Sequence, residues 1–202
     1  IVTRGQDNTV RTWESATGKE LAHFSMTGNN GLSAFSPDGR VLVVMGYDSV
    51  CRVWDVAAGK AVAEFGGHPE YVHAVAVSAD GRLVASASGS TVRLFSGPGK
   101  EPRLLPGVKG PARAVAFSPD GTRLASGGMD RVVRVWDTAT GELVRSFEDG
   151  LAAVGSVAFR PDGEVLAAAV NNVVARWDLK SGRPLPALAC PVQIESLAFR
   201  PD

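Results

Sequence analysis

Residues 126–137 read SGGMDRVVRVWD, and the pattern of this stretch recurs along the chain. It combines small residues, an Asp that suits a tight turn, a run rich in β-branched valine and a final Trp-Asp pair. An aromatic residue returns every 41 residues, at Trp13, Trp54, Phe95, Trp136 and Trp177. Six positions before each aromatic residue stands a turn-forming residue: Asp7, Asp48, Gly89, Asp130 and Asn171. The chain therefore consists of five repeats that keep the same phase.

A second motif marks the same repeats independently. Ser36-Pro37-Asp38-Gly39 returns with small changes at 78–81, 118–121 and 160–163. Proline presets φ and glycine supplies a positive φ, so the motif predicts a tight turn rather than a catalytic site. Alternating apolar segments at 32–35, 41–44, 51–54 and 61–65 predict four strands in one repeat. Four-stranded repeats of this length predict the blades of an all-β propeller that spans residues 1–202.

Composition argues against several classes of function. Lys and Arg number 21, as do Asp and Glu, and no block of like charge occurs. Nucleic-acid and membrane-surface binders usually show a basic patch, so neither partner is expected. No apolar run approaches the ~20 residues of a membrane helix. Two cysteines make no disulfide framework, which favours a reducing, cytoplasmic location. No signal peptide precedes the first repeat, and the ends fall inside predicted elements, which indicates a piece of a longer protein.

The motifs FSPDG, D-x-x-V-R-V-W-D and T-G-E-L resemble those of the WD-repeat β-propeller family, and in particular those of its bacterial members. The resemblance covers essentially the whole chain. It implies four-stranded antiparallel blades around a central channel and a rigid docking platform for proteins or peptides. It implies no catalytic activity, no cofactor and no metal. The repeated turn carboxylates lie on different blades, far from one another, so they are not expected to share a metal ion.

The same resemblance implies structural roles for several residues. Family blades are braced by a His in the entry loop, a Ser or Thr on the second strand, an Asp in the turn and a Trp on the third strand. The residues that match are Asp7, Asp48, Asp130, Trp13, Trp54, Trp136, Trp177 and His68. The repeat that contains His68 has Gly89 and Phe95 at the Asp and Trp positions, so no blade has the full set.

Residues that often carry chemistry have structural interpretations here. His23, His68 and His73 are the three histidines, and no nucleophile, base and oxyanion donor come together. Cys51 aligns with valines of the other repeats, which predicts a core position. Arginines stand two residues before four of the repeat aromatics, and we expect them to pair with acidic groups between blades: Arg11, Arg52, Arg93 and Arg134.

The candidate binding residues lie at positions where the sequences of the repeats differ, because loops at one end of a propeller are free to vary. In the family, the start of the first strand and the residue before the turn Asp flank the channel mouth. Tyr, Met and Arg at such positions are typical of protein interfaces. The predicted partner-binding residues are Tyr47, Tyr71, His73, Arg113, Met129, Gln193 and Glu195. Alternatives are a small-molecule or glycan-binding propeller, and a sensor or targeting module of a larger enzyme.

Two arrangements of the ends are open. The N-terminus supplies the last three strands of a blade and the C-terminus supplies a first strand. A five-bladed ring would close by pairing residues 196–199 with the N-terminal strands, which would remove exposed sheet edges. The favoured alternative is an arc of a larger ring, since the family usually has seven blades. An arc needs further blades from the parent chain or self-association.

Overall fold

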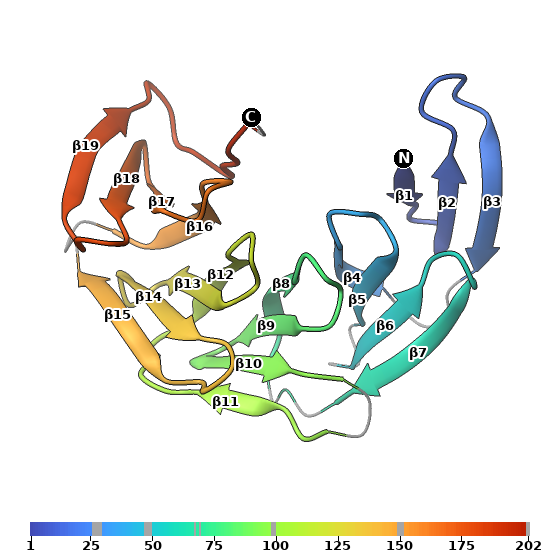
Figure 1. The fold of residues 1–202 in the computed structure, drawn as a ribbon, viewed down its shortest axis with the longest axis horizontal. Helices are drawn as coiled ribbons and strands as arrows, with labels where there is room; N and C mark the ends of the chain where they lie inside the picture. The colour runs from blue at the N-terminus through green and yellow to red at the C-terminus, as the bar shows by residue number, and fades with distance from the viewer. Residues whose placement is uncertain are drawn as a thin grey trace.

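The chain folds into antiparallel sheets arranged along an arc. The computed structural model describes residues 1–25, 30–46, 50–66, 68, 70–97, 100–148 and 152–200. These residues form nineteen strands in five sheets and contain no helix (Figure 1). The prediction of an all-β fold of short-stranded, propeller-type sheets is confirmed.

The first sheet contains β1 (Val2–Arg4), β2 (Thr9–Trp13) and β3 (Glu20–Ser25). The second contains β4 (Asn30–Phe35), β5 (Val41–Gly46), β6 (Cys51–Asp55) and β7 (Lys60–Phe65). The third contains β8 (Val72–Val77), β9 (Val84–Ser88), β10 (Thr91–Phe95) and β11 (Arg103–Leu105). The fourth contains β12 (Ala112–Phe117), β13 (Arg123–Gly128), β14 (Val132–Asp137) and β15 (Leu143–Glu148). The fifth contains β16 (Val154–Phe159), β17 (Val165–Val170), β18 (Val173–Asp178) and β19 (Pro184–Ala189).

Each sheet is a meander whose strands follow one another in chain order. The first strands β4, β8, β12 and β16 contact one another in succession and line the inner side of the arc (Figure 1). The last strands of the sheets form its outer rim. The two chain ends lie on either side of the opening of the arc.

The tight turn after each first strand is held by its own side chains. The hydroxyl of Ser36 donates to Asp38 Oδ1 at 2.6 Å and accepts the backbone N–H of Val41 at 2.9 Å. Gly39 has a φ of 71°, a left-handed conformation that glycine adopts without strain. The hydrogen bond from Ser36 lowers the pKa of Asp38, so this carboxylate stays charged and keeps its turn. The corresponding turns at Ser78 and Ser118 have the same serine–aspartate bond.

Neighbouring sheets meet through aromatic side chains. Phe24 on β3 stacks on Trp54 of β6 with ring centroids 5.3 Å apart, and Phe147 on β15 stacks on Trp177 of β18 at 4.7 Å. In each pair the partners are 30 residues apart, because the last strand of one sheet contacts the third strand of the next. Trp136 fills the same kind of interface and donates its indole N–H to the carbonyl of Pro106.

The ends of the arc differ from its middle. The first sheet has three strands, and residues 190–200 form no strand, so the described residues contain no pairing that closes a ring. Trp13 in the first sheet is partly exposed, whereas Trp54, Trp136 and Trp177 are buried. The number of blades around the complete ring stays a prediction.

The buried indoles should carry much of the stability. Trp136 is 0% exposed, so Trp136→Ala should lower the free energy of unfolding by about 3–5 kcal/mol. Trp13→Ala is the matched control in the first sheet and should cost clearly less, because its indole is already partly in water. Equilibrium urea unfolding measures both. Equal costs for the two variants would contradict the role given to the contact between sheets.

The open arc should also affect association. Ile1 and Leu21 near one end of the arc and Leu188 and Val192 near the other are between 50% and 69% exposed, and such apolar side chains favour association. We expect the 202-residue chain on its own to self-associate in sedimentation velocity experiments as its concentration rises. A compact monomer with the mass of one chain at all concentrations would instead support a closed five-bladed ring.

Candidate functional site

The meander order sorts the connections between strands to two opposite faces. The loops that enter each first strand and the turns between second and third strands lie at one end, here called the loop face. The serine–aspartate turns and the loops after the repeat aromatics lie at the other end, here called the turn face. Strand residues are fixed by packing between sheets, so sequence is freer to vary at these two faces.

A cleft of about 350 Å³ opens on the loop face across the third, fourth and fifth sheets. Four of the predicted partner-binding residues line it: His73, Arg113, Met129 and Gln193. The rest of its lining consists of Ala153, Val154, Gly155, Ala169, Asn171 and Ile194. The structure therefore brings together residues that are as much as 121 positions apart in the sequence.

Tyr71 adjoins this cleft through His73. Their rings meet edge to face with centroids 5.3 Å apart, and Tyr71 is 52% exposed. Burial lowers the pKa of His73, the nearby Arg113 guanidinium lowers it further, and Glu70 opposes the shift. His73 is therefore neutral at pH 7, with one ring nitrogen to donate and one to accept a hydrogen bond. Arg113 supplies the positive charge at this edge of the cleft.

The far edge of the cleft is positioned by backbone hydrogen bonds. The N–H of Ile194 donates to the carbonyl of Asn171 at 2.7 Å, and the N–H of Cys190 donates to that of Asn172 at 2.7 Å. These bonds hold the segment that carries Gln193 against the turn between β17 and β18. Asn171 adopts a φ of 53°, which asparagine tolerates better than most residues. The cleft thus combines an apolar floor with a polar rim.

Two predicted residues are not part of this arrangement. Tyr47 lies outside the described residues. Glu195 is exposed and does not line the cleft. Sequence reasoning did not select Asn171 and Ile194, which line the cleft. Asn171 was visible only as a turn residue, and Ile194 lies in a segment that forms no strand in the structure.

The turn aspartates connect the loop face to the strands. Asp130 forms an ion pair with Arg134 at 2.6 Å, and both side chains are buried. Asp130 also accepts the backbone N–H of Lys109 at 3.2 Å, so it ties the entry loop to the turn. Asp7 pairs with Arg11 at 3.0 Å near the surface. Asp48 lies outside the described residues.

The arginine column pairs within sheets. Arg11 contacts Asp7 and Glu20, Arg52 contacts Glu64, and Arg134 contacts Asp130. The acidic partner belongs to the same sheet as the arginine in each case, so the prediction of pairs between blades is wrong for these three. Antiparallel register places oppositely charged side chains of adjacent strands side by side, as for Arg52 and Glu64.

His68 is a buried histidine with one hydrogen-bonded nitrogen. Its Nε2 lies 2.6 Å from Ser86 Oγ on β9, whereas its Nδ1 has no partner. Gly89 stands where three of the other repeats carry a turn aspartate, which explains the unpaired nitrogen. Burial, followed by the charge of Arg93, lowers the pKa of His68 to about 4. The imidazole is therefore neutral at pH 7 and acts within the third sheet rather than in the cleft.

The pKa of His68 makes stability depend on pH. Between its ordinary value of 6.5 and about 4, the unfolded chain binds a proton that the folded chain excludes. The contribution of neutral His68 is complete above pH 6.5 and is lost as the pH falls toward 4. His68→Gln should flatten this decline in urea unfolding measured across that range, while the exposed control His23→Gln should keep it. An unchanged slope in His68→Gln would contradict the assignment.

Within the part of the chain that the structure describes, the cysteines and the potential metal ligands do not form a second site. Cys51 is buried, and burial raises the pKa of its thiol to about 12, as suits a core residue. Within the described residues, no three His, Cys, Asp or Glu side chains are grouped so as to hold a metal ion. The described part of the chain also has no helix of the length and apolarity needed to cross a membrane.

The repeats of this chain match a known protein family. The family model for the WD domain, G-beta repeat, matches residues 20–55, 59–96 and 99–137, more than half of the chain. This chain belongs to the WD-repeat family. Each matched segment runs from the last strand of one sheet to the repeat aromatic of the next, so one sequence repeat links two sheets.

Curated relatives resemble this chain over part of its length. An uncharacterized WD repeat-containing protein of Synechocystis is 38% identical over 44% of this chain. The small ribosomal subunit protein RACK1y of Oryza sativa is 34% identical over 57% of it, and the periodic tryptophan protein 2 homolog of Mus musculus is 32% identical over 66%. The alignments span 26%, 35% and 14% of these relatives, respectively.

Proposed function

We propose that this chain is a non-catalytic scaffold that docks a protein or peptide in the loop-face cleft. The observation that supports this most is that His73, Arg113, Met129 and Gln193, contributed by three repeats, line one depression. Family membership supports the coarser statement, since WD-repeat proteins act as protein-interaction scaffolds. A reducing, cytoplasmic setting is part of the proposal and follows from the two unpaired cysteines.

The chemistry of the cleft favours an extended, mixed-polarity segment as its occupant. Arg113 offers charge-assisted hydrogen bonds to a carboxylate or a backbone carbonyl. Tyr71 and Met129, each about half exposed, offer a large contact area, and few polar groups must be desolvated when a partner covers them. The buried Val154 and Ala169 give an apolar floor against which one side chain of the partner is desolvated.

The alternative functions make different demands on the site. A glycan or small-molecule propeller would present similar pockets at every repeat, whereas these cleft residues differ from repeat to repeat. A sensor or targeting module of a larger enzyme would use the same docking cleft, with catalysis in another part of the parent protein. The docking proposal therefore covers both the isolated scaffold and the targeting module.

The double substitution Tyr71→Ala with Arg113→Ala should abolish partner capture, because it removes the aromatic edge and the charge of the cleft together. Immobilised wild-type and variant chains are exposed to the same native lysate, and captured proteins are compared by quantitative mass spectrometry. The partner is defined as the protein retained by the wild type and lost with the double variant. Both side chains are exposed, so the melting temperature should change little.

Val144→Ala provides the control, because Val144 is 54% exposed on the outer rim, away from the cleft. This variant should retain the partner at wild-type levels. Retention by the double variant, or loss with Val144→Ala alone, would place the docking surface on the outer strands instead.

A further inference from the structure

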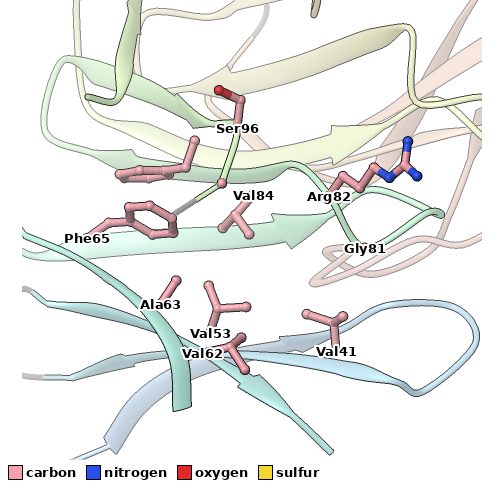
Figure 2. Close-up of a pocket in the computed structure, with 11 residues that line it drawn as sticks. Val41, Val53, Val62, Ala63, Phe65, Gly81, Arg82, Val84 and Ser96 are labelled. Atoms are coloured by element: carbon pink, nitrogen blue, oxygen red, sulfur yellow. The ribbon is translucent and has the colours of Figure 1, made fainter. Parts of the chain in front are cut away.

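A second cleft lies on the turn face, at the interface between the second and third sheets. Its volume is about 290 Å³. It is lined by Val41, Val53, Val62, Ala63, Phe65, Gly81, Arg82, Val84, Phe95, Ser96 and Gly97. In Figure 2, Val53, Val62 and Ala63 lie across the gap from Val84, and the guanidinium of Arg82 points away from these apolar side chains. The floor of the cleft is therefore apolar, with a cation at its edge.

The repeats themselves explain why this interface is hollow. Two residues after the repeat aromatic, Val56 in the second sheet and Leu179 in the fifth are 7% and 6% exposed, and both pack into the apolar cluster around the Trp of their sheet. The third sheet has Gly97 at that position. No described heavy atom lies within 4 Å of a Cβ built on Gly97.

The repeat aromatic is also smaller here. Phe95 replaces the Trp of the other repeats and meets Phe65 with ring centroids 4.5 Å apart. Compared with the second and fifth sheets, this interface therefore lacks both the second ring of an indole and an aliphatic side chain. Protein interiors are normally packed without such gaps. Covering the exposed apolar surface with an apolar group is therefore favourable.

The space beside Phe95 and Gly97 and the charge of Arg82 at its edge indicate which kind of ligand fits the cleft. Two other interfaces, between the first and second and between the fourth and fifth sheets, have an indole stacked on phenylalanine, so an aromatic ring is complementary to Phe65 and Phe95. Arg82 is the charged residue that lines the described part of the cleft. Its nearest acidic contact, with Asp80 at 3.9 Å, joins two largely exposed side chains and leaves the guanidinium able to meet another carboxylate. The volume lies at the lower limit for ligand pockets, which suits one side chain of a peptide.

We propose that this turn-face cleft binds an aromatic side chain, indole or phenyl, of a peptide that carries an acidic residue next to it. The site is separate from the loop-face cleft because it lies at the opposite end of the strands. A single propeller then engages two segments, or two partners, on opposite faces. A substitution that abolishes binding at one cleft should therefore leave binding at the other unchanged.

The proposal is tested with capped dipeptides as probes: Trp-Glu, Trp-Lys and Leu-Glu. Methyl-region NMR of the 202-residue chain should show saturable shifts of Val53, Ala63 and Val84 with Trp-Glu. Leu-Glu should bind more weakly because it lacks the ring. Trp-Lys should bind up to about fivefold more weakly than Trp-Glu, since an exposed charge pair contributes little in water. Arg82→Gln should remove this difference between Trp-Glu and Trp-Lys.

Two variants fill the cleft from opposite walls. Phe95→Trp restores the residue of the other repeats, and Ala63→Leu fills the gap from β7. Each should weaken Trp-Glu binding at least about tenfold, with a melting temperature equal to or above that of the wild type. The matched control is Ala22→Leu, which occupies the equivalent position on β3 and should leave binding unchanged. Because two filling variants are used, poor folding of one does not prevent the test.

Several outcomes would overturn the proposal. Absence of shifts at millimolar Trp-Glu would show that the cleft takes no aromatic residue. Binding that survives both filling variants would locate the probe elsewhere. Self-association that Phe95→Trp and Ala63→Leu both abolish would identify a second copy of this chain as the occupant. Tyr71→Ala with Arg113→Ala should leave Trp-Glu binding intact, which separates this test from that of the loop face.

Discussion

The contact between the outer strand of one sheet and the third strand of the next holds the arc together. No single sheet buries both of its faces, so each repeat depends on its neighbour for a core. Phe24 with Trp54 and Phe147 with Trp177 show how this is done: each pair stacks, and such pairs contribute about 0.5–1.5 kcal/mol beyond the area they bury. The sequence repeat that links two sheets has its physical basis in this contact, because its first strand and its last aromatic meet at the same interface, as Phe24 and Trp54 do in the segment 20–55.

Polar bracing is secondary and varies between repeats. In the fourth sheet the buried pair of Asp130 and Arg134 joins the turn to the strand, and Asp130 also holds the entry loop. In the third sheet His68 has Ser86 but no turn carboxylate, so one imidazole nitrogen is left without a partner. A half-satisfied polar group of this kind is costly in a low-dielectric interior. Apolar packing must therefore compensate there, although that same sheet has the smallest repeat aromatic.

The fold could be predicted because it rests on periodic features. A Trp or Phe every 41 residues and an Asp-Gly turn after four of the first strands determine strand order, register and sheet type, and all are local in sequence. The loop-face cleft was predictable in part, since His73 and Arg113 occupy equivalent variable positions at the start of first strands, and Met129 occupies the variable position before a turn Asp. Asn171 and Ile194 were not, because their place depends on backbone bonds between residues about 20 positions apart. The partners of Arg11 and Arg52 were misplaced for a related reason: charge composition gives no information about which strand faces which.

The two clefts arise in opposite ways, and this bears on how a repeat protein acquires sites. The loop-face cleft forms where large side chains vary at positions that no neighbouring sheet constrains. The turn-face cleft forms where two constrained positions, Phe95 and Gly97, lose atoms that the other interfaces keep. Removing buried atoms normally destabilises a core, so such losses persist only where the remaining contacts suffice. The close pair of Phe65 and Phe95 supplies such contacts, which leaves the space beside it available for another group. In a repeat protein, a departure from the consensus inside a packed interface is therefore as informative about binding as a variable loop.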